Sequence, residues 1–144
     1  MGRRAVVAVM ALVQRAGVRV RWALTLAWTA LAALLMLSPS GDGTAVTFIS
    51  KLFGGTATSD AVGHFLINGV LALLWCWTLS LYASPARITR LMLIGGCVWG
   101  VAGELAQYLA PQRGVALLDM GANLLGVVIG VLLYGRFRAE GTTY

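Results

Sequence analysis

Polar side chains of the kinds that bind ligands or transfer protons recur at regular spacing within the apolar sequence of this chain. They form three pairs, His/Asn, Glu/Gln and Asp/Asn, whose members are three or four residues apart, so each pair lies on one face of a helix. With an arginine between the last two pairs, the set is His64, Asn68, Glu104, Gln107, Arg113, Asp119 and Asn123. An imidazole and two carboxylates can exchange protons, and an arginine beside a histidine can bind a phosphate or carboxylate group.

The elements that carry these residues are predicted to be transmembrane helices. Hydrophobic residues make up 59% of the 144 residues and charged residues 11%, whereas a soluble domain has roughly 45–50% and about 25%. Apolar runs at 22–37, 61–83, 91–110 and 114–135 can each cross a bilayer as a helix, the first by borrowing residues 18–21, whose arginines would reach back to the interface. The predicted fold class is therefore all-α: an integral membrane bundle of four transmembrane helices in one domain at 22–135.

The basic residues predict the orientation. Nine arginines fall on the side of both termini, and only Lys51 and Arg113 fall on the other side. This asymmetry predicts a multi-pass protein of the cell membrane with both termini cytoplasmic: a basic segment at 1–21 and a tail at 136–144. The net charge of +6 does not indicate nucleic acid, because the arginines end apolar runs and form no basic stripe on a soluble module.

Two short features allow simple interpretations. The apolar run at 5–13 is too short to span, and we expect an amphipathic extension on the inner surface; a signal-peptide core and the start of a longer first helix are the alternatives. Cys76 and Cys97 lie within apolar runs, without metal-ligand spacing, and are expected to be packing residues.

The predicted topology puts the three polar pairs at one depth, in the outer half of the membrane. Counted at about 1.5 Å per residue, each of the six side chains lies roughly 5–13 Å from the outer end of its helix. A carboxylate at the centre of a membrane helix costs roughly 2.5–3.5 kcal/mol, so these groups should face one another or a wet pocket. The alternative is structural: an ion pair of Arg113 with Asp119 or Glu104, and asparagines that join helices by hydrogen bonds.

Spaced glycines predict where helices pack closely. Gly96 and Gly100 form one small-xxx-small pattern, and Gly126 and Gly130 form another. Such patterns let two helix backbones approach.

The polar set resembles that of the VanZ-like membrane proteins, a family named for a teicoplanin-resistance protein. The family pattern is an Asp-Lys pair before a histidine, then Glu-x-x-Gln, a loop arginine, Asp-x-x-x-Asn and spaced glycines. The matching residues are Asp60, His64, Glu104, Gln107, Arg113, Asp119, Asn123, Gly126 and Gly130. Ala61 departs from the pattern, because the family has lysine there. The resemblance implies a role at the cell envelope that affects lipoglycopeptide susceptibility.

Two functions of different classes follow. In the first, a non-enzymatic protein binds an envelope lipid headgroup or amphiphile in an outer-leaflet polar pocket, and its partners are membrane lipids, a lipid-linked envelope precursor or a lipoglycopeptide. No cofactor or metal is expected in this case, and oligomerisation is compatible with it. In the alternative, a membrane enzyme acts on a lipid-linked substrate, with Glu104, Asp119 and His64 as acid/base or metal-binding residues. A transporter is disfavoured, because the sequence has no inverted repeat and the inner half of the last three helices is nearly all apolar.

Overall fold

The protein is an all-helical bundle whose helices are long and apolar enough to cross a membrane. The computed structural model describes residues 17–37, 56–107 and 116–141. Its helices are α2 (Val18–Leu37), α4 (Ala57–Leu79), α5 (Pro85–Gln107) and α6 (Leu117–Gly141). At about 1.5 Å per residue, helices of this length match the roughly 30 Å hydrocarbon core of a bilayer. The predicted helical class and the four candidate spans are confirmed, and they fit a multi-pass membrane protein.

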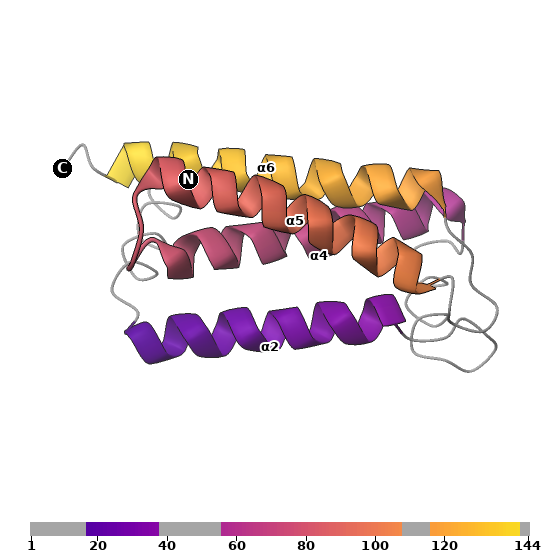
Figure 1. The fold of residues 1–144 in the computed structure, drawn as a ribbon, viewed down its shortest axis with the longest axis horizontal. Coiled ribbons are helices and arrows are strands. Elements are labelled where there is room, and N and C mark those ends of the chain that lie inside the picture. Colours follow the sequence, from indigo (N-terminus) through magenta and orange to yellow (C-terminus); the bar gives the residue numbers. More distant parts are fainter. Residues whose placement is uncertain (1–16, 38–55, 108–115, 142–144) are drawn as a thin grey trace, which may run out of the picture.

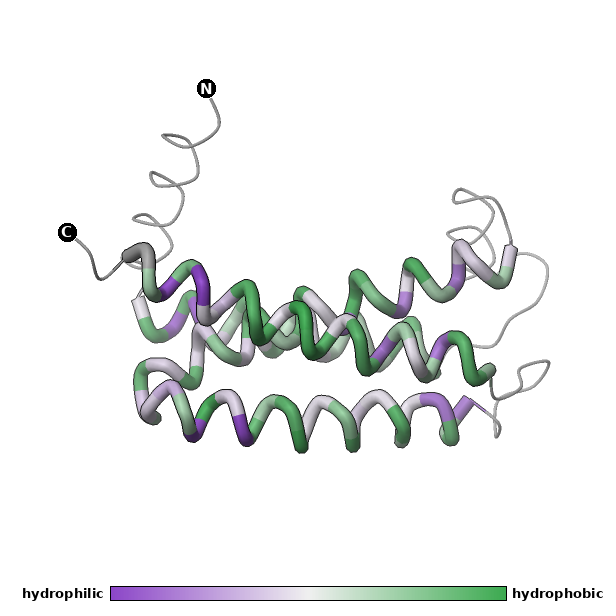
Figure 2. Tube along the Cα trace, turned by 90° about the horizontal axis from the view of Figure 1, so that it is seen from above, coloured by the Kyte–Doolittle hydropathy of each residue, from purple (hydrophilic) through white to green (hydrophobic). Residues whose placement is uncertain are grey.

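The helices alternate in direction along the bundle (Figure 1). α4 and α6 begin at the end where α2 and α5 finish. We call this the His64 end, and the opposite end the Arg21 end. α4 packs most extensively against α6, α5 packs on α6, and α2 packs on α4 and α5. Figure 2 shows hydrophilic segments toward both ends of the helices and mainly hydrophobic ones between them.

Two spans begin earlier than the apolar runs predict. α4 starts at Ala57 rather than at residue 61, because Thr56 and Ser59 form a capping box that satisfies backbone N–H groups of its first turn. α5 starts at Pro85 rather than at residue 91, since proline suits the first position of a helix. The polar and basic residues on these first turns are compatible with a helix that extends to the membrane surface.

The remaining boundaries also differ in part. α4 ends at Leu79, with Ser80 as its cap, instead of at residue 83. α6 begins at Leu117 and continues to Gly141, so residues 136–141 extend the last helix. α2 begins at Val18, which confirms that the first span borrows residues before 22. The apolar run at 5–13, the third-span residues after 107 and Arg113 lie outside the described residues.

The closest helix contact is between α4 and α6, and it depends on glycine. A Cβ atom on Gly126 would collide with the carbonyl oxygen of Phe65, and one on Gly130 would collide with that of Gly69. Between α5 and α6, a Cβ on Gly96 would lie 2.6 Å from Val127 Cγ1. Both glycine patterns therefore pack against neighbouring helices as predicted.

Arg21 is buried against α4 near the start of α2. It is 7% exposed. Its guanidinium lies 4.8 Å from the centre of the Trp77 ring, and Nη1 donates to Trp77 O at 3.1 Å and to Ser80 Oγ at 3.4 Å. The guanidinium therefore donates hydrogen bonds to a carbonyl and a hydroxyl group at the end of α4. Without it, these groups would need water as a partner.

Candidate functional site

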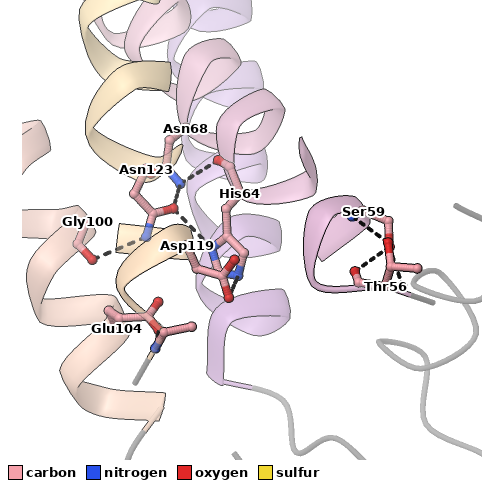
Figure 3. A network of polar contacts seen from close by, with 9 residues as sticks. Thr56, Ser59, His64, Asn68, Gly100, Glu104, Asp119 and Asn123 are labelled. Atoms are coloured by element: carbon pink, nitrogen blue, oxygen red, sulfur yellow. Dashed lines mark hydrogen bonds and ion pairs between the residues drawn. The ribbon is translucent and has the colours of Figure 1, made fainter. Parts of the chain in front are cut away.

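The predicted pairs on α4 and α6 meet at the His64 end of the bundle (Figure 3). His64 Nδ1 lies 3.0 Å from Asn123 Oδ1, and Asn68 Nδ2 donates to the same oxygen at 2.7 Å. His64 Nε2 lies 3.9 Å from Asp119 Oδ2. Both members of each pair therefore contact the facing helix, because four-residue spacing keeps them on one face.

The close approach of the backbones makes these contacts possible. Gly126 and Gly130 let α6 lie directly on the α4 backbone, so short asparagine side chains reach across. On the other side, a Cβ on Gly100 would lie 3.0 Å from Asn123 Cβ. Asn123 Nδ2 donates to Gly100 O at 3.4 Å. Asn123 thus contacts both α4 and α5 and is fully buried.

A chain of hydrogen bonds fixes which ring nitrogen of His64 carries a proton. The carbonyl oxygen of His64 can only accept, so the side-chain group of Asn68 that lies 3.0 Å from it is the NH₂. The same NH₂ faces Asn123, whose facing atom must then be its oxygen. An amide oxygen accepts, so His64 Nδ1 donates to Asn123 Oδ1. In the neutral ring, Nε2 therefore presents its lone pair on the side of Asp119.

Glu104 joins the group from α5 and is fully buried. Its Oε1 accepts a hydrogen bond of 2.7 Å from the backbone N–H of Ala116, next to the start of α6. The Glu104 side chain thus supplies an acceptor near the start of α6, where the first N–H groups of the helix lack partners within it. Its Oε2 is buried and has no hydrogen-bond partner among the described residues.

One imidazole nitrogen and one oxygen from each of two carboxylates converge at this point. The ligand atoms of His64, Glu104 and Asp119 all lie within 4.8 Å of one another. The side chains of His64 and Asp119 are 14% and 15% exposed. We call His64, Asn68, Glu104, Asp119 and Asn123 the polar cluster. Its three titratable groups could exchange a proton, bind a cation or bind hydrogen-bond donors of a ligand.

The two other predicted residues stand apart from this cluster. Gln107 is 3% exposed and its Nε2 has no partner among the described residues. It lies one turn beyond Glu104 on α5, and nothing in the described part of the structure ties it to His64 or Asp119. Arg113 lies outside the described residues.

The cluster forms although the predicted depths along the helices were inaccurate. His64 lies about 10 Å from the start of α4, roughly twice the predicted 5 Å, and Asp119 about 3 Å from the start of α6 instead of 8 Å. These errors have one cause: α4 starts four residues earlier and α6 three residues later than the apolar runs. The two side chains still meet, because α4 is offset along its axis relative to α6.

A second set of polar residues between helices, buried or partly buried, was missed by the sequence interpretation. Arg21, Thr25 and Thr29 lie four residues apart along α2 and face α4. Thr25 Oγ1 lies 2.8 Å from Thr78 Oγ1, and Thr29 Oγ1 accepts from Trp75 Nε1 at 3.1 Å. The half of α4 at the Arg21 end is therefore less apolar at its α2 face than expected. The four-residue repeat of polar residues in α2 was the signal that could have revealed it.

Comparison with known proteins identifies no function. The chain matches no family model. It is similar to a protein of Schizosaccharomyces pombe named "Uncharacterized protein C11E3.10", with 35% identity over 86 residues that cover 57% of this chain and 52% of the relative. The chain thus spans about half the length of that relative. No solved structure matches. Inference about function therefore depends on the geometry of the polar cluster.

Proposed function

We propose that the polar cluster binds the polar headgroup of an envelope lipid, or a similar amphiphile, in the outer leaflet of the cell membrane. Buried Glu104 carries this proposal. Its carboxylate forms one hydrogen bond among the described residues, and its second oxygen is buried without a partner. An unpaired buried polar atom costs about 1–3 kcal/mol, and more when it is charged. A hydroxyl or ammonium group of a lipid headgroup would supply the missing donor.

Other atoms near this end support a ligand rather than a purely structural network. Asn68 Oδ1 and Gln107 Nε2 are also buried without partners among the described residues. Asparagines that serve only to join helices would be expected to use both ends of each amide group. Among the described residues, the contacts between helices do not use two acceptors, Asn68 Oδ1 and Glu104 Oε2, and one donor, Gln107 Nε2. These groups suit a ligand that both donates and accepts hydrogen bonds.

The distribution of arginines supports the outer-leaflet position. All six arginines among the described residues, Arg19, Arg21, Arg87, Arg90, Arg136 and Arg138, lie on turns at the Arg21 end. Membrane proteins retain basic residues on the cytoplasmic side. The Arg21 end, with both termini, is then cytoplasmic, and the His64 end faces outward in a multi-pass protein of the cell membrane.

We also propose a VanZ-like identity and an effect on susceptibility to lipoglycopeptides. The support is the residue pattern from Glu104 to Asn123, of which Glu104, Asp119 and Asn123 lie around one point with His64. A protein that holds a lipid-linked envelope precursor or a lipoglycopeptide at the outer surface would change how much of the antibiotic reaches its target. The lysine that this family has after Asp60 is Ala61 here, so binding has to proceed without that charge.

Lipid retention tests the proposed binding. Protein purified in mild detergent and stripped of metal by a chelator is analysed by native mass spectrometry for bound lipid. We expect a defined lipid class on the wild type and roughly tenfold weaker retention, about 1.4 kcal/mol, in the isosteric double variant Glu104→Gln/Asp119→Asn. Glu140→Gln is the matched control, since Glu140 lies near the end of α6, at the opposite end of the bundle. Equal retention by the wild type and a folded double variant would contradict headgroup binding at this cluster.

Catalysis on a lipid-linked substrate is the second candidate function. It is favoured by one observation, the approach of His64, Glu104 and Asp119 to within 4.8 Å, which suits acid/base chemistry. Purified protein incubated with envelope lipids, with and without divalent metal, should then release headgroups, and His64→Gln should abolish the release. Absence of turnover under both conditions would exclude catalysis and retain lipid binding as the proposed function.

A further inference from the structure

We propose that His64, Glu104 and Asp119 form a binding site for one divalent transition metal ion such as Zn²⁺ or Mn²⁺. From the sequence, no metal was expected for headgroup binding, and these residues were named as metal-binding only in the enzyme alternative, because they follow no metal-binding motif. The fold brings them together from α4, α5 and α6. The proposal does not depend on headgroup binding.

The spacing of the donor atoms fits an ion between them. Nitrogen and carboxylate oxygen ligands lie about 2.0–2.2 Å from such ions, so two ligands on one ion are at most roughly 4.4 Å apart. His64 Nε2 and Asp119 Oδ2 are already 3.9 Å apart, and the largest separation in the set is within 4.8 Å. In a tetrahedral site such ligands are roughly 3.4 Å apart, so side-chain movements of about 0.5–1.4 Å would complete the coordination.

The hydrogen bonds around His64 prepare its ring for a metal. A metal-binding histidine usually donates its other ring N–H to a carbonyl or carboxylate oxygen, which fixes the tautomer and the ring plane. Here Nδ1 donates to Asn123 Oδ1, and Asn123 is itself held by Asn68 and by Gly100 O. Nε2 is left with its lone pair toward the carboxylates.

Glu104 provides a second, independent indication. Its side chain is fully buried, one oxygen is fixed by Ala116 N–H, and the other has no partner among the described residues. A dication would give that carboxylate a counter-charge within an apolar bundle, where an unpaired charge is costly. The described arginines cannot do so, because they lie at the Arg21 end.

The donor set points to the class of ion. Imidazole favours Zn²⁺ and related transition metals, and carboxylates also accept Mn²⁺, so one nitrogen and two oxygens suit this series better than Ca²⁺ or Cu⁺. Three protein ligands leave at least one position open for water or for an oxygen of a bound molecule. In a membrane protein that binds headgroups, this position would suit a phosphate oxygen.

Metal binding to the lipid-depleted protein tests the site. The full-length chain is treated with chelator in detergent, equilibrated with Zn²⁺ or Mn²⁺ alone, and analysed for metal content and affinity. We expect one ion per chain, and at least a tenfold loss of affinity in His64→Gln, Glu104→Gln and Asp119→Asn, with Glu140→Gln, at the other end of the bundle, unchanged. In the Mn²⁺-loaded protein, pulsed electron paramagnetic resonance should show coupling to an imidazole nitrogen that His64→Gln abolishes.

The result that would overturn the site is the absence of stoichiometric metal, or equal binding by the wild type and His64→Gln. If Glu104→Gln does not fold, His64→Gln still decides, since the His64 side chain is partly exposed and Asn68 still bonds Asn123 across the same interface without it. Lipid retention is measured without metal and metal binding without added lipid. Failure of one proposal is therefore distinguishable from failure of the other.

Discussion

His64 Nδ1 donates to Asn123 Oδ1 across the interface between α4 and α6, at 3.0 Å. The bond connects two residues that are 59 positions apart in the chain, at the place where glycines bring the two backbones together. It determines that the other ring nitrogen, Nε2, is the one directed toward Asp119 and Glu104. The same hydrogen bond thus joins two packed helices and orients the His64 ring in the polar cluster.

The hydrogen bond between Asn68 and Asn123 should be measurable as a coupling energy. Asn68 Nδ2 donates to Asn123 Oδ1 at 2.7 Å, and both residues are fully buried. Interhelical hydrogen bonds in membranes contribute about 0.6 kcal/mol on average and up to about 1.7 kcal/mol. A double-mutant cycle of Asn68→Ala and Asn123→Ala, followed by unfolding in detergent, should give a coupling in this range. Asn68→Ala and Thr25→Ala should be additive within about 0.5 kcal/mol, and a zero coupling for the first pair would refute the contact.

Gly126 should not tolerate alanine. The added methyl group would meet Phe65 O in the α4 backbone, which cannot move aside as a flexible side chain could. Overpacking of this kind costs about 1–3 kcal/mol. Gly135→Ala on the same helix meets nothing within 4 Å and should be neutral or stabilising by up to about 1 kcal/mol. Thermal unfolding of both variants in one detergent measures the difference, and equal melting temperatures would contradict the α4–α6 contact.

Arg21 should contribute to stability, whereas its neighbour Arg19 should not. Arg21→Met keeps the apolar stem but removes the hydrogen bonds to Trp77 O and Ser80 Oγ and the contact with the Trp77 ring. We expect a loss of about 1–3 kcal/mol in the free energy of unfolding. Arg19 is exposed, so Arg19→Met should change it by less than about 0.5 kcal/mol. If both variants unfold alike, Arg21 is not buried as described.

The orientation of the bundle can be tested by labelling single cysteines. Ala57 is exposed at the start of α4 and Ser84 is exposed before α5, so they lie at opposite ends of the bundle. In a background without Cys76 and Cys97, we expect Ala57→Cys to react with an impermeant maleimide in intact cells and Ser84→Cys to react only after permeabilisation. The reverse pattern would place the polar cluster on the cytoplasmic side.

Much of the architecture could be predicted from hydropathy and charge alone. Four long apolar runs leave little choice but helices, because a bilayer cannot satisfy backbone groups in any open structure. Residue spacing also predicted that the polar pairs on α4 and α6 would meet, since each pair lies on one helical face. Gly126 and Gly130 indicated a close contact, although the sequence did not reveal that α4 would be the partner.

The parts that failed depend on local helix capping or on contacts between segments distant in sequence. Capping by Thr56 and the Pro85 start moved two helix boundaries beyond the apolar runs, because local hydrogen bonds and not hydropathy determine where a helix begins. The bond from Ala116 N–H to Glu104 requires the path of the chain between α5 and α6, which spacing cannot supply. The burial of Arg21 was not predicted, because nothing in its own helix indicates the Trp77 ring beside it.

A structure of the protein determined in lipid nanodiscs tests the central claim, that the polar cluster is a binding site, most directly. We predict density for a polar group within hydrogen-bonding distance of Glu104 and next to His64 and Asp119, in the leaflet at the His64 end. Density for acyl chains alone beside this cluster, with Glu104 Oε2 paired to another side chain of the same protein, would show that these residues only hold the helices together.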